Sequence, residues 1–291
     1  MGDLLNLIRG FLMGSADVVP GVSGGTVALV LGIYPRLVHS IRTAAGGLGS
    51  LVRGRFRQAR SRFGEVEWRF LLVLLAGILI AVFSLAALIE RLLDDHPREV
   101  AAAFFGLVAG SLLIAWRLVG ARNGKRIGVA AAAGVAAFLL LGLRSGEAAD
   151  PAAWAFLLAG MVAIVAMILP GVSGSFILLM LGMYQPVLGA VNDRRLAVLA
   201  VFVVGAAAGL AAFSTLLDRL LRHHHDTVVA ALVGLMAGSL RVLWPWPDGT
   251  GSAALGLPGS GDWAGPALSA AAGFAVVMLI AAAARRAGPH R

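Results

Sequence analysis

The sequence predicts an all-α integral membrane protein of two inverted repeats, each with one broken, re-entrant helical hairpin and three transmembrane helices. Of its 291 residues, 59% are hydrophobic and only 13% are charged, whereas about 25% are charged in soluble domains. The mean hydropathy is +0.88. Apolar runs of about 20 residues, the length that crosses ~30 Å of hydrocarbon as a helix, recur along the chain. Finally, the two halves of the sequence contain the same helix-breaking motif.

The motif defines the repeat. Pro20–Tyr34, PGVSGGTVALVLGIY, aligns with Pro170–Tyr184, PGVSGSFILLMLGMY, at nine identical positions. We therefore expect a first membrane repeat over 1–145 and a second, inverted repeat over 146–291, which together form one transmembrane domain.

Each repeat begins with an interrupted apolar segment and continues with three spans. The expected segments are 4–40, 68–90, 99–118 and 126–143 in the first repeat, then 152–190, 196–217, 227–244 and 266–284 in the second. A second pair of similar stretches, GLVAGSL at Gly106–Leu112 and GLMAGSL at Gly234–Leu240, has small residues at four-residue spacing. That spacing predicts faces for close helix packing.

A basic insertion in the first repeat, a loop at about 42–65, predicts the orientation of the chain. It carries six arginines and no acidic residue up to position 62: Arg42, Arg53, Arg55, Arg57, Arg60 and Arg62. The positive-inside rule makes the insertion cytoplasmic, and an even number of crossings then makes both termini cytoplasmic. Arg194 and Arg195 are exceptions to this arrangement. The insertion is expected to attract anionic membrane lipids. We expect no nucleic-acid partner, because aromatic stacking residues do not accompany the arginines.

The broken helices predict an anion site. Pro20 removes a backbone donor, while Gly21, Gly24 and Gly25 permit positive φ and close approach of the backbone. Non-helical backbone at membrane depth is tolerated only where protein groups or a water-filled cavity supply its hydrogen-bond partners. Ser23 or Thr26 can cap the helix that follows, and its free N–H groups then suit a phosphate or carboxylate. Packing alone is the alternative for one motif, but its repetition favours a site that both loops form near the bilayer midplane.

Charged residues within or near the apolar segments are further candidates. Asp17 precedes the first motif, where the second half has Met167, and an intramembrane carboxylate suggests a proton carrier or a partner of Arg9. An interfacial Asp17 reached by water is the alternative. Arg241, inside a span, is a weaker candidate for contacting an anion.

Other polar residues predict no catalytic or metal site. We expect four residues at helix ends to be solvated or paired with each other: Glu90, Arg91, Asp218 and Arg219. The histidine triplet at 223–225 predicts a polar turn, since it lacks the companions of a metal site. GVSG also matches the pattern around a serine nucleophile, but no span carries a histidine base at its middle. We therefore expect neither an enzyme nor a cofactor.

The two motifs resemble the paired motifs of the bacterial polyprenyl-phosphate (undecaprenyl phosphate) transporter family. GSADVVPGVSGGTVALVLGIYPRLV and PGVSGSFILLMLGMYQPVL carry this resemblance, which covers essentially the whole chain. It implies a multi-pass protein of the bacterial cytoplasmic (inner) membrane. Such a flippase returns undecaprenyl phosphate, the lipid carrier of cell-wall precursors, from the outer to the inner leaflet. The phosphate-binding residues that the resemblance implies are Asp17, Pro20, Gly21, Ser23, Gly24, Gly25, Thr26, Pro170, Gly171, Ser173, Gly174 and Ser175.

A phosphate with one to two negative charges costs about 2.3 to 4.6 kcal/mol to move inward against ~100 mV. We therefore expect protons to accompany the lipid, with Asp17 as the candidate carrier. The alternative function is a secondary transporter of a small soluble anion, which the same loops could hold. A homo-oligomer is compatible with the sequence.

Overall fold

The computed structural model describes residues 2–18, 23–143, 151–247, 249, 255–259 and 261–286. These residues form helices and connecting turns, without a strand among them. The helices are α1 (Gly2–Asp17), α2 (Gly24–Val30), α3 (Tyr34–Val52), α4 (Phe56–Glu65), α5 (Trp68–Asp95), α6 (Pro97–Arg117), α7 (Gly124–Leu140), α8 (Ala153–Ile168), α9 (Gly174–Met180), α10 (Tyr184–Asn192), α11 (Leu196–Ser239) and α12 (Ala264–Arg286). The all-α prediction is confirmed for this part of the chain.

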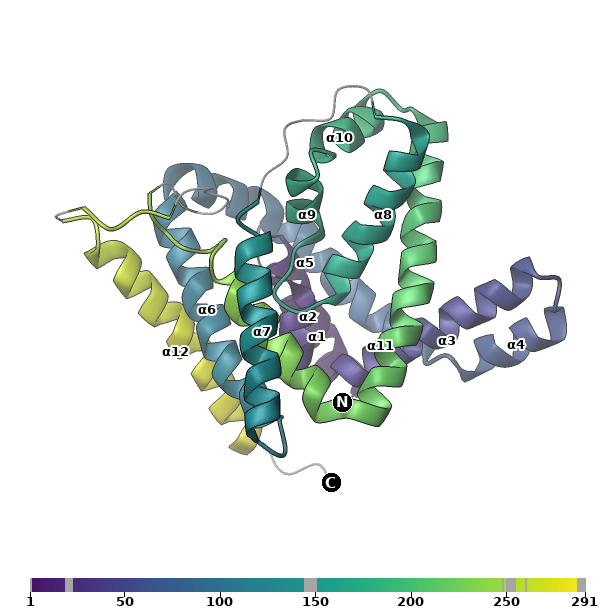
Figure 1. The fold of residues 1–291 in the computed structure, drawn as a ribbon, viewed down its shortest axis with the longest axis horizontal. Helices are drawn as coiled ribbons and strands as arrows, with labels where there is room; N and C mark the ends of the chain where they lie inside the picture. The colour runs from purple at the N-terminus through teal and green to yellow at the C-terminus, as the bar shows by residue number, and fades with distance from the viewer. Residues whose placement is uncertain are drawn as a thin grey trace.

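Several helices match the expected spans (Figure 1). Within the described residues, four are long and apolar enough to cross a membrane: α5, α6, α11 and residues 264–282 of α12. The short helices α9 and α10 meet the same criterion only as a pair, and they are bent by 110°. The apolar helix α8 is shorter, with 16 residues. This set of helices fits a multi-pass membrane protein.

Both interrupted segments break near the motif. A seven-residue helix follows each break, α2 after α1 and α9 after α8. Figure 1 shows α9 running back alongside α8, and the two helices pack against each other, as α1 and α2 also do. The two halves therefore share an order of elements. Their inverted relation and the boundary at 145/146 stay predictions, and residues 144–150 lie outside the described part of the chain.

The spans expected at 196–217 and 227–244 lie in the two arms of α11, of which the second arm ends at Ser239. The arms meet at a kink at His224, where φ is −138° and ψ is 40°. Figure 1 shows α11 changing direction at its lower end. The kink lies within the histidine triplet at 223–225, so the polar turn expected there is confirmed as the bend between the two arms.

The basic insertion is a helical hairpin rather than a loop. α3 and α4 pack against each other and project from the body of the protein (Figure 1). Arginine, the commonest residue of this segment, is a good helix former. Gly47 allows the close approach of α4, because a Cβ there would lie 2.9 Å from the Phe63 ring. The arginines and five glycines of 42–65 favour a loop in the sequence, whereas α3 and α4 form helices that pack against each other.

Segments that the charge pattern assigns to one side of the membrane meet at one end of the protein. In the turn after α6, the N–H of Ala121 donates to Asp226 at the kink of α11, with an N–O distance of 3.2 Å. At the opposite end, Arg98 pairs with Asp262 over 3.2 Å, which joins the start of α6 to the segment before α12. The arrangement agrees with the predicted sidedness of these turns. Their orientation in the membrane stays a prediction.

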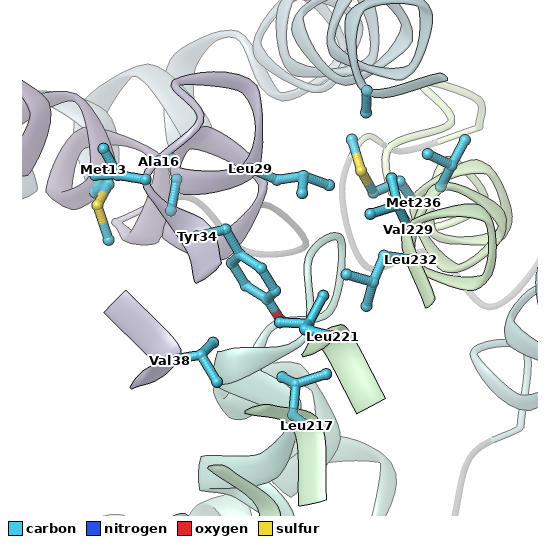
Figure 2. Close-up of a cluster of buried hydrophobic side chains, with 14 of the residues drawn as sticks. Met13, Ala16, Leu29, Tyr34, Val38, Leu217, Leu221, Val229, Leu232 and Met236 are labelled. Atoms are coloured by element: carbon cyan, nitrogen blue, oxygen red, sulfur yellow. The ribbon is translucent and has the colours of Figure 1, made fainter. Parts of the chain in front are cut away.

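Side chains from both halves form the largest buried cluster (Figure 2). Tyr34, at the start of α3, lies at its centre and is only 1% exposed. Leu29 approaches it from α2, while Leu217 and Leu221 approach it from α11. This core brings the region after the first motif against the second half of the chain.

Glycines set the spacing of the long helices. A Cβ at Gly106 of α6 would overlap the carbonyl oxygen of Ala270 in α12, and one at Gly234 of α11 would overlap that of Ala130 in α7. Small residues allow helix backbones to approach this closely. Packing faces at GLVAGSL and GLMAGSL are therefore confirmed. Each face joins a helix of one half to a helix of the other.

We expect Gly106→Val to destabilise the protein by about 1–3 kcal/mol or more, because overpacking forces α6 away from α12. Thermal unfolding of the purified protein in detergent measures this effect. Gly128→Val in α7 is the matched control, since a Cβ there meets nothing within 4 Å and the change in helix propensity is the same. Equal midpoints for the two variants would contradict the packing assignment.

Candidate functional site

The first motif begins α2 with a side-chain cap. Ser23 has extended backbone angles, φ −133° and ψ 133°, and its Oγ accepts a hydrogen bond from the N–H of Gly25 over 3.1 Å. This is the N-cap arrangement that serine favours. Ser23 is 1% exposed and Thr26 is 2% exposed. Pro20 and Gly21 lie outside the described residues.

Asp17 closes the other side of the break. It is the last residue of α1, and its Oδ1 accepts a hydrogen bond from the N–H of Gly24 over 2.6 Å. A Cβ on Gly24 would lie 2.6 Å from Oδ2, so only glycine lets the carboxylate come this close. The carboxylate thus uses one of the free N–H groups at the start of α2.

The loop of the second motif contains a glycine with positive φ. Gly171 has φ +84°, a conformation that L side chains rarely adopt, and a Cβ there would lie 2.7 Å from the Cα of Met236. The Oγ atoms of Ser173 and Ser175 are 2.9 Å apart, within hydrogen-bond distance. Gly171 therefore fits the motif closely onto α11.

The two motifs are not equivalent in their surroundings. Gly24 faces the Asp17 carboxylate, whereas the aligned Gly174 faces the side chain of Met167, with a hypothetical Cβ–Cγ distance of 2.6 Å. The first break therefore presents a charged group where the second presents an apolar one.

The structure brings the two motifs together. The Oγ of Ser23 donates to the carbonyl oxygen of Met167 over 3.4 Å, and the hydroxyl of Tyr34 donates to that of Ile168 over 3.0 Å. A Cβ on Gly25 would lie 2.9 Å from the Ile168 oxygen and 3.5 Å from the Pro170 nitrogen. The sequence assigned Tyr34 no role. The Gly-x-Tyr sequence that ends both motifs could have indicated that Tyr34 has a role.

The three charged candidates are not brought together. Arg9 and Asp17 are eight residues apart in α1, which is about 12 Å along the helix axis. The Nη1 of Arg9 donates instead to the Oδ1 of Asn6 over 3.0 Å. The guanidinium of Arg241 lies 4.6 Å from the centre of the Phe138 ring in α7. The pairing of Arg9 with Asp17 is thus absent among the described contacts.

The serine hydroxyls of the motifs have structural partners. Ser23 bonds to backbone groups, and Ser173 lies against another hydroxyl. Neither arrangement supplies the base that a nucleophilic serine needs. Within the described residues, the contacts of these serines favour binding or capping.

A family model described as undecaprenyl phosphate translocase-like matches residues 13–254, a range that includes both motifs. The chain belongs to this family. It is 40% identical over 248 residues to a polyprenyl-phosphate transporter of Vibrio cholerae, covering 85% of this chain and 80% of that protein. It is also 31% identical over 258 residues to a polyprenyl-phosphate transporter of Staphylococcus aureus, covering 83% and 86%. No solved structure matches the chain.

This translocase-like chain also contains an ionic cluster around a buried carboxylate, which joins α3 to α11. The Asp218 side chain, 5% exposed, pairs with Arg42 over 2.6 Å, with Arg222 over 2.9 Å and with His39 over 3.1 Å. The expectation that Asp218 is solvated or paired with residues such as Arg219 was wrong. Folding of the basic insertion into helices brings Arg42 and His39 onto α11, which the sequence could not show.

We expect Asp218→Asn to destabilise this translocase-like protein by about 3 kcal/mol, because Arg42, Arg222 and His39 lose their shared carboxylate. The loss is at the lower end of the range for buried pairs, since both arginines are partly exposed. Unfolding of the purified protein in detergent tests this prediction. Asp193→Asn, at an exposed position, should leave stability within about 0.5 kcal/mol. If both variants behaved alike, the cluster would not stabilise the fold.

Proposed function

We propose that this chain is a flippase that returns undecaprenyl phosphate from the outer to the inner leaflet of the bacterial cytoplasmic membrane. The observation that carries the proposal is its 40% identity over 248 residues to a polyprenyl-phosphate transporter. Helices suited to a membrane span support transport within a bilayer. The carrier lipid would thereby be recycled for cell-wall synthesis. The chain itself would act as a transporter rather than an enzyme.

The paired motifs are the proposed head-group site. The proposed site is made of side-chain and backbone groups of both motifs. Its residues are Pro20, Gly21, Ser23, Gly24, Gly25 and Thr26 of the first motif, and Pro170, Gly171, Ser173, Gly174 and Ser175 of the second. The contacts of Ser23 and Tyr34 with the end of α8 support this grouping. Because glycine has no Cβ, the N–H of Gly24 would be open to a phosphate oxygen once the Asp17 carboxylate moved away. The polyprenyl tail stays in lipid while the head group passes between the broken helices.

Asp17 provides a way to couple transport to protons. Its carboxylate occupies the N–H of Gly24, a donor that a phosphate oxygen would also use. Two anions cannot share this donor without strong repulsion. Protonation of Asp17 would remove the competing charge, and the accompanying proton would offset the cost of about 2.3 kcal/mol per charge moved against ~100 mV.

The charge pattern supports an orientation with both termini and the α3–α4 hairpin in the cytoplasm. The arginines of the hairpin would then face the anionic inner surface of the membrane. Arg36 and Glu67 form an ion pair at the base of this region. The Arg36 guanidinium lowers the pKa of Glu67, so this pair stays charged at neutral pH.

We expect Ser23→Ala and Ser173→Ala each to reduce lipid flipping about tenfold or more, since each removes a buried hydroxyl from a head-group loop. Purified protein in proteoliposomes tests this, with the accessibility of undecaprenyl phosphate measured in each leaflet. Ser84→Ala, an exposed position of α5, should flip lipid at the wild-type rate. If folded wild-type protein moved no lipid under a proton gradient of either sign, the function would instead be transport of a small soluble anion.

We expect Asp17→Asn to abolish the acceleration of flipping by a proton gradient, because asparagine keeps an oxygen near Gly24 but cannot bind and release a proton. The assay compares initial rates in proteoliposomes with and without a pH difference. Asp3→Asn, in the exposed first turn of the same helix, is the matched control and should retain the dependence. Wild-type transport by Asp17→Asn at every pH would exclude Asp17 as the proton carrier.

A further inference from the structure

The outer part of α3 carries an apolar stripe that the described residues leave uncovered. Its members Leu48, Leu51 and Val52 are 49%, 42% and 82% exposed. Leu51 and Val52 follow Leu48 by three and four residues, which puts the three side chains on one face of the helix. Phe56, at the start of α4 and 70% exposed, adds a fourth large apolar side chain at the tip of the hairpin. A contiguous apolar group of this kind marks an interaction surface.

The stripe faces away from α4. α4 packs on α3 through Phe63, whose ring lies against Gly47 so closely that a Cβ there would be 2.9 Å away. Ser50 is two residues from both Leu48 and Val52, so it points to the other side of the helix, and it is buried. One side of α3 is therefore used within the hairpin, and the apolar side is left over.

The inner end of the hairpin is fixed near the kink of α11. Arg42 and His39 of α3 pair with Asp218, in the first arm of α11 and shortly before the kink at His224. Figure 1 shows the hairpin projecting sideways from this region, with α4 on the side of α3 toward the kinked end of the protein. Because the stripe faces away from α4, it is directed toward the level at which the long helices cross the membrane.

Arginines surround the apolar tip. Arg53 directly follows the stripe, and Arg55 and Arg57 stand on either side of Phe56; all three are exposed. The sequence has no acidic residue between positions 42 and 64. A bilayer surface matches this combination, because it offers hydrocarbon to the apolar side chains and anionic phosphates to the cations. A second copy of the chain on the same surface would bring two groups of arginines together, which like-charge repulsion disfavours.

We propose that α3 lies in the interface of the bilayer, with its apolar stripe at the edge of the acyl chains and the arginines of the tip on anionic lipid phosphates. The hairpin is then a membrane-surface element beside the transmembrane helices. Its arginines and its apolar side chains contact the same lipids. This proposal concerns how the protein contacts the membrane and does not depend on which substrate it transports.

The test uses single cysteines, since the sequence contains none of its own. Leu48→Cys and Val52→Cys probe the stripe, and Ser61→Cys, at an exposed position of α4, is the matched control. Each full-length variant carries one fluorophore and is reconstituted in vesicles that contain phosphatidylglycerol. Quenching is measured with nitroxide-labelled lipid and with iodide present on both sides of the membrane. All three positions are exposed, so the substitutions leave the core intact.

We expect nitroxide lipid to quench the Leu48 and Val52 labels at least about threefold more than the Ser61 label, and iodide to give the reverse order, because the stripe is buried at the hydrocarbon boundary. Iodide quenching equal to that of the Ser61 label would place the stripe in water and overturn the proposal. Protection from both quenchers would also overturn it, because a second copy or another protein would then cover the stripe.

Neutral vesicles of phosphatidylcholine test the role of the arginines. We expect quenching of the Val52 label by nitroxide lipid to fall at least about twofold in these vesicles, because arginines stabilise contact with an anionic surface. The Ser61 label should change little. Equal quenching of the Val52 label in neutral and anionic vesicles would overturn the assignment of the arginines to lipid phosphates.

Discussion

Two carbonyl oxygens at the end of α8 connect the broken segments of the protein. α8 ends at Ile168, so the carbonyls of Met167 and Ile168 have no following helical turn to bond with. In apolar surroundings each unsatisfied group would cost several kcal/mol. Ser23 and Tyr34 donate to these oxygens from the other half of the chain. The second half can therefore break its helix here because the first half supplies the hydrogen-bond donors.

The packing around the two breaks depends on the contact of Tyr34 with the end of α8. Tyr34 must be buried to reach α8, and side chains from α2, α3 and α11 surround it. Glycines at the crossings of α6 with α12 and of α7 with α11 allow the long helices to pack closely around this centre. At one end, the Asp218 cluster joins α3 to α11. The largest buried cluster and these helix crossings both combine the two halves.

The two breaks differ in the side chains and spaces that surround them. Tyr184 aligns with Tyr34 but is 37% exposed. The first break carries a carboxylate and adjoins an apolar cavity, while the second presents Met167 in the place of Asp17. Under the proposed function, two loops that differ in this way suit a ligand with a charged head and one apolar chain.

The sequence by itself determined the helical membrane class, the two breaks, the packing glycines and the family. These features depend on composition and on local pattern, since proline, glycine and apolar runs act within a few residues of their position. Only the tertiary structure showed the α3–α4 hairpin, the role of Tyr34, the partners of Asp218 and the cavity beside Thr26. The last three depend on contacts between residues far apart in the chain, such as Arg42 and Asp218, which are 176 positions apart. The sequence shows which polar groups need hydrogen-bond or ionic partners, but only the tertiary structure determines which partner each group has.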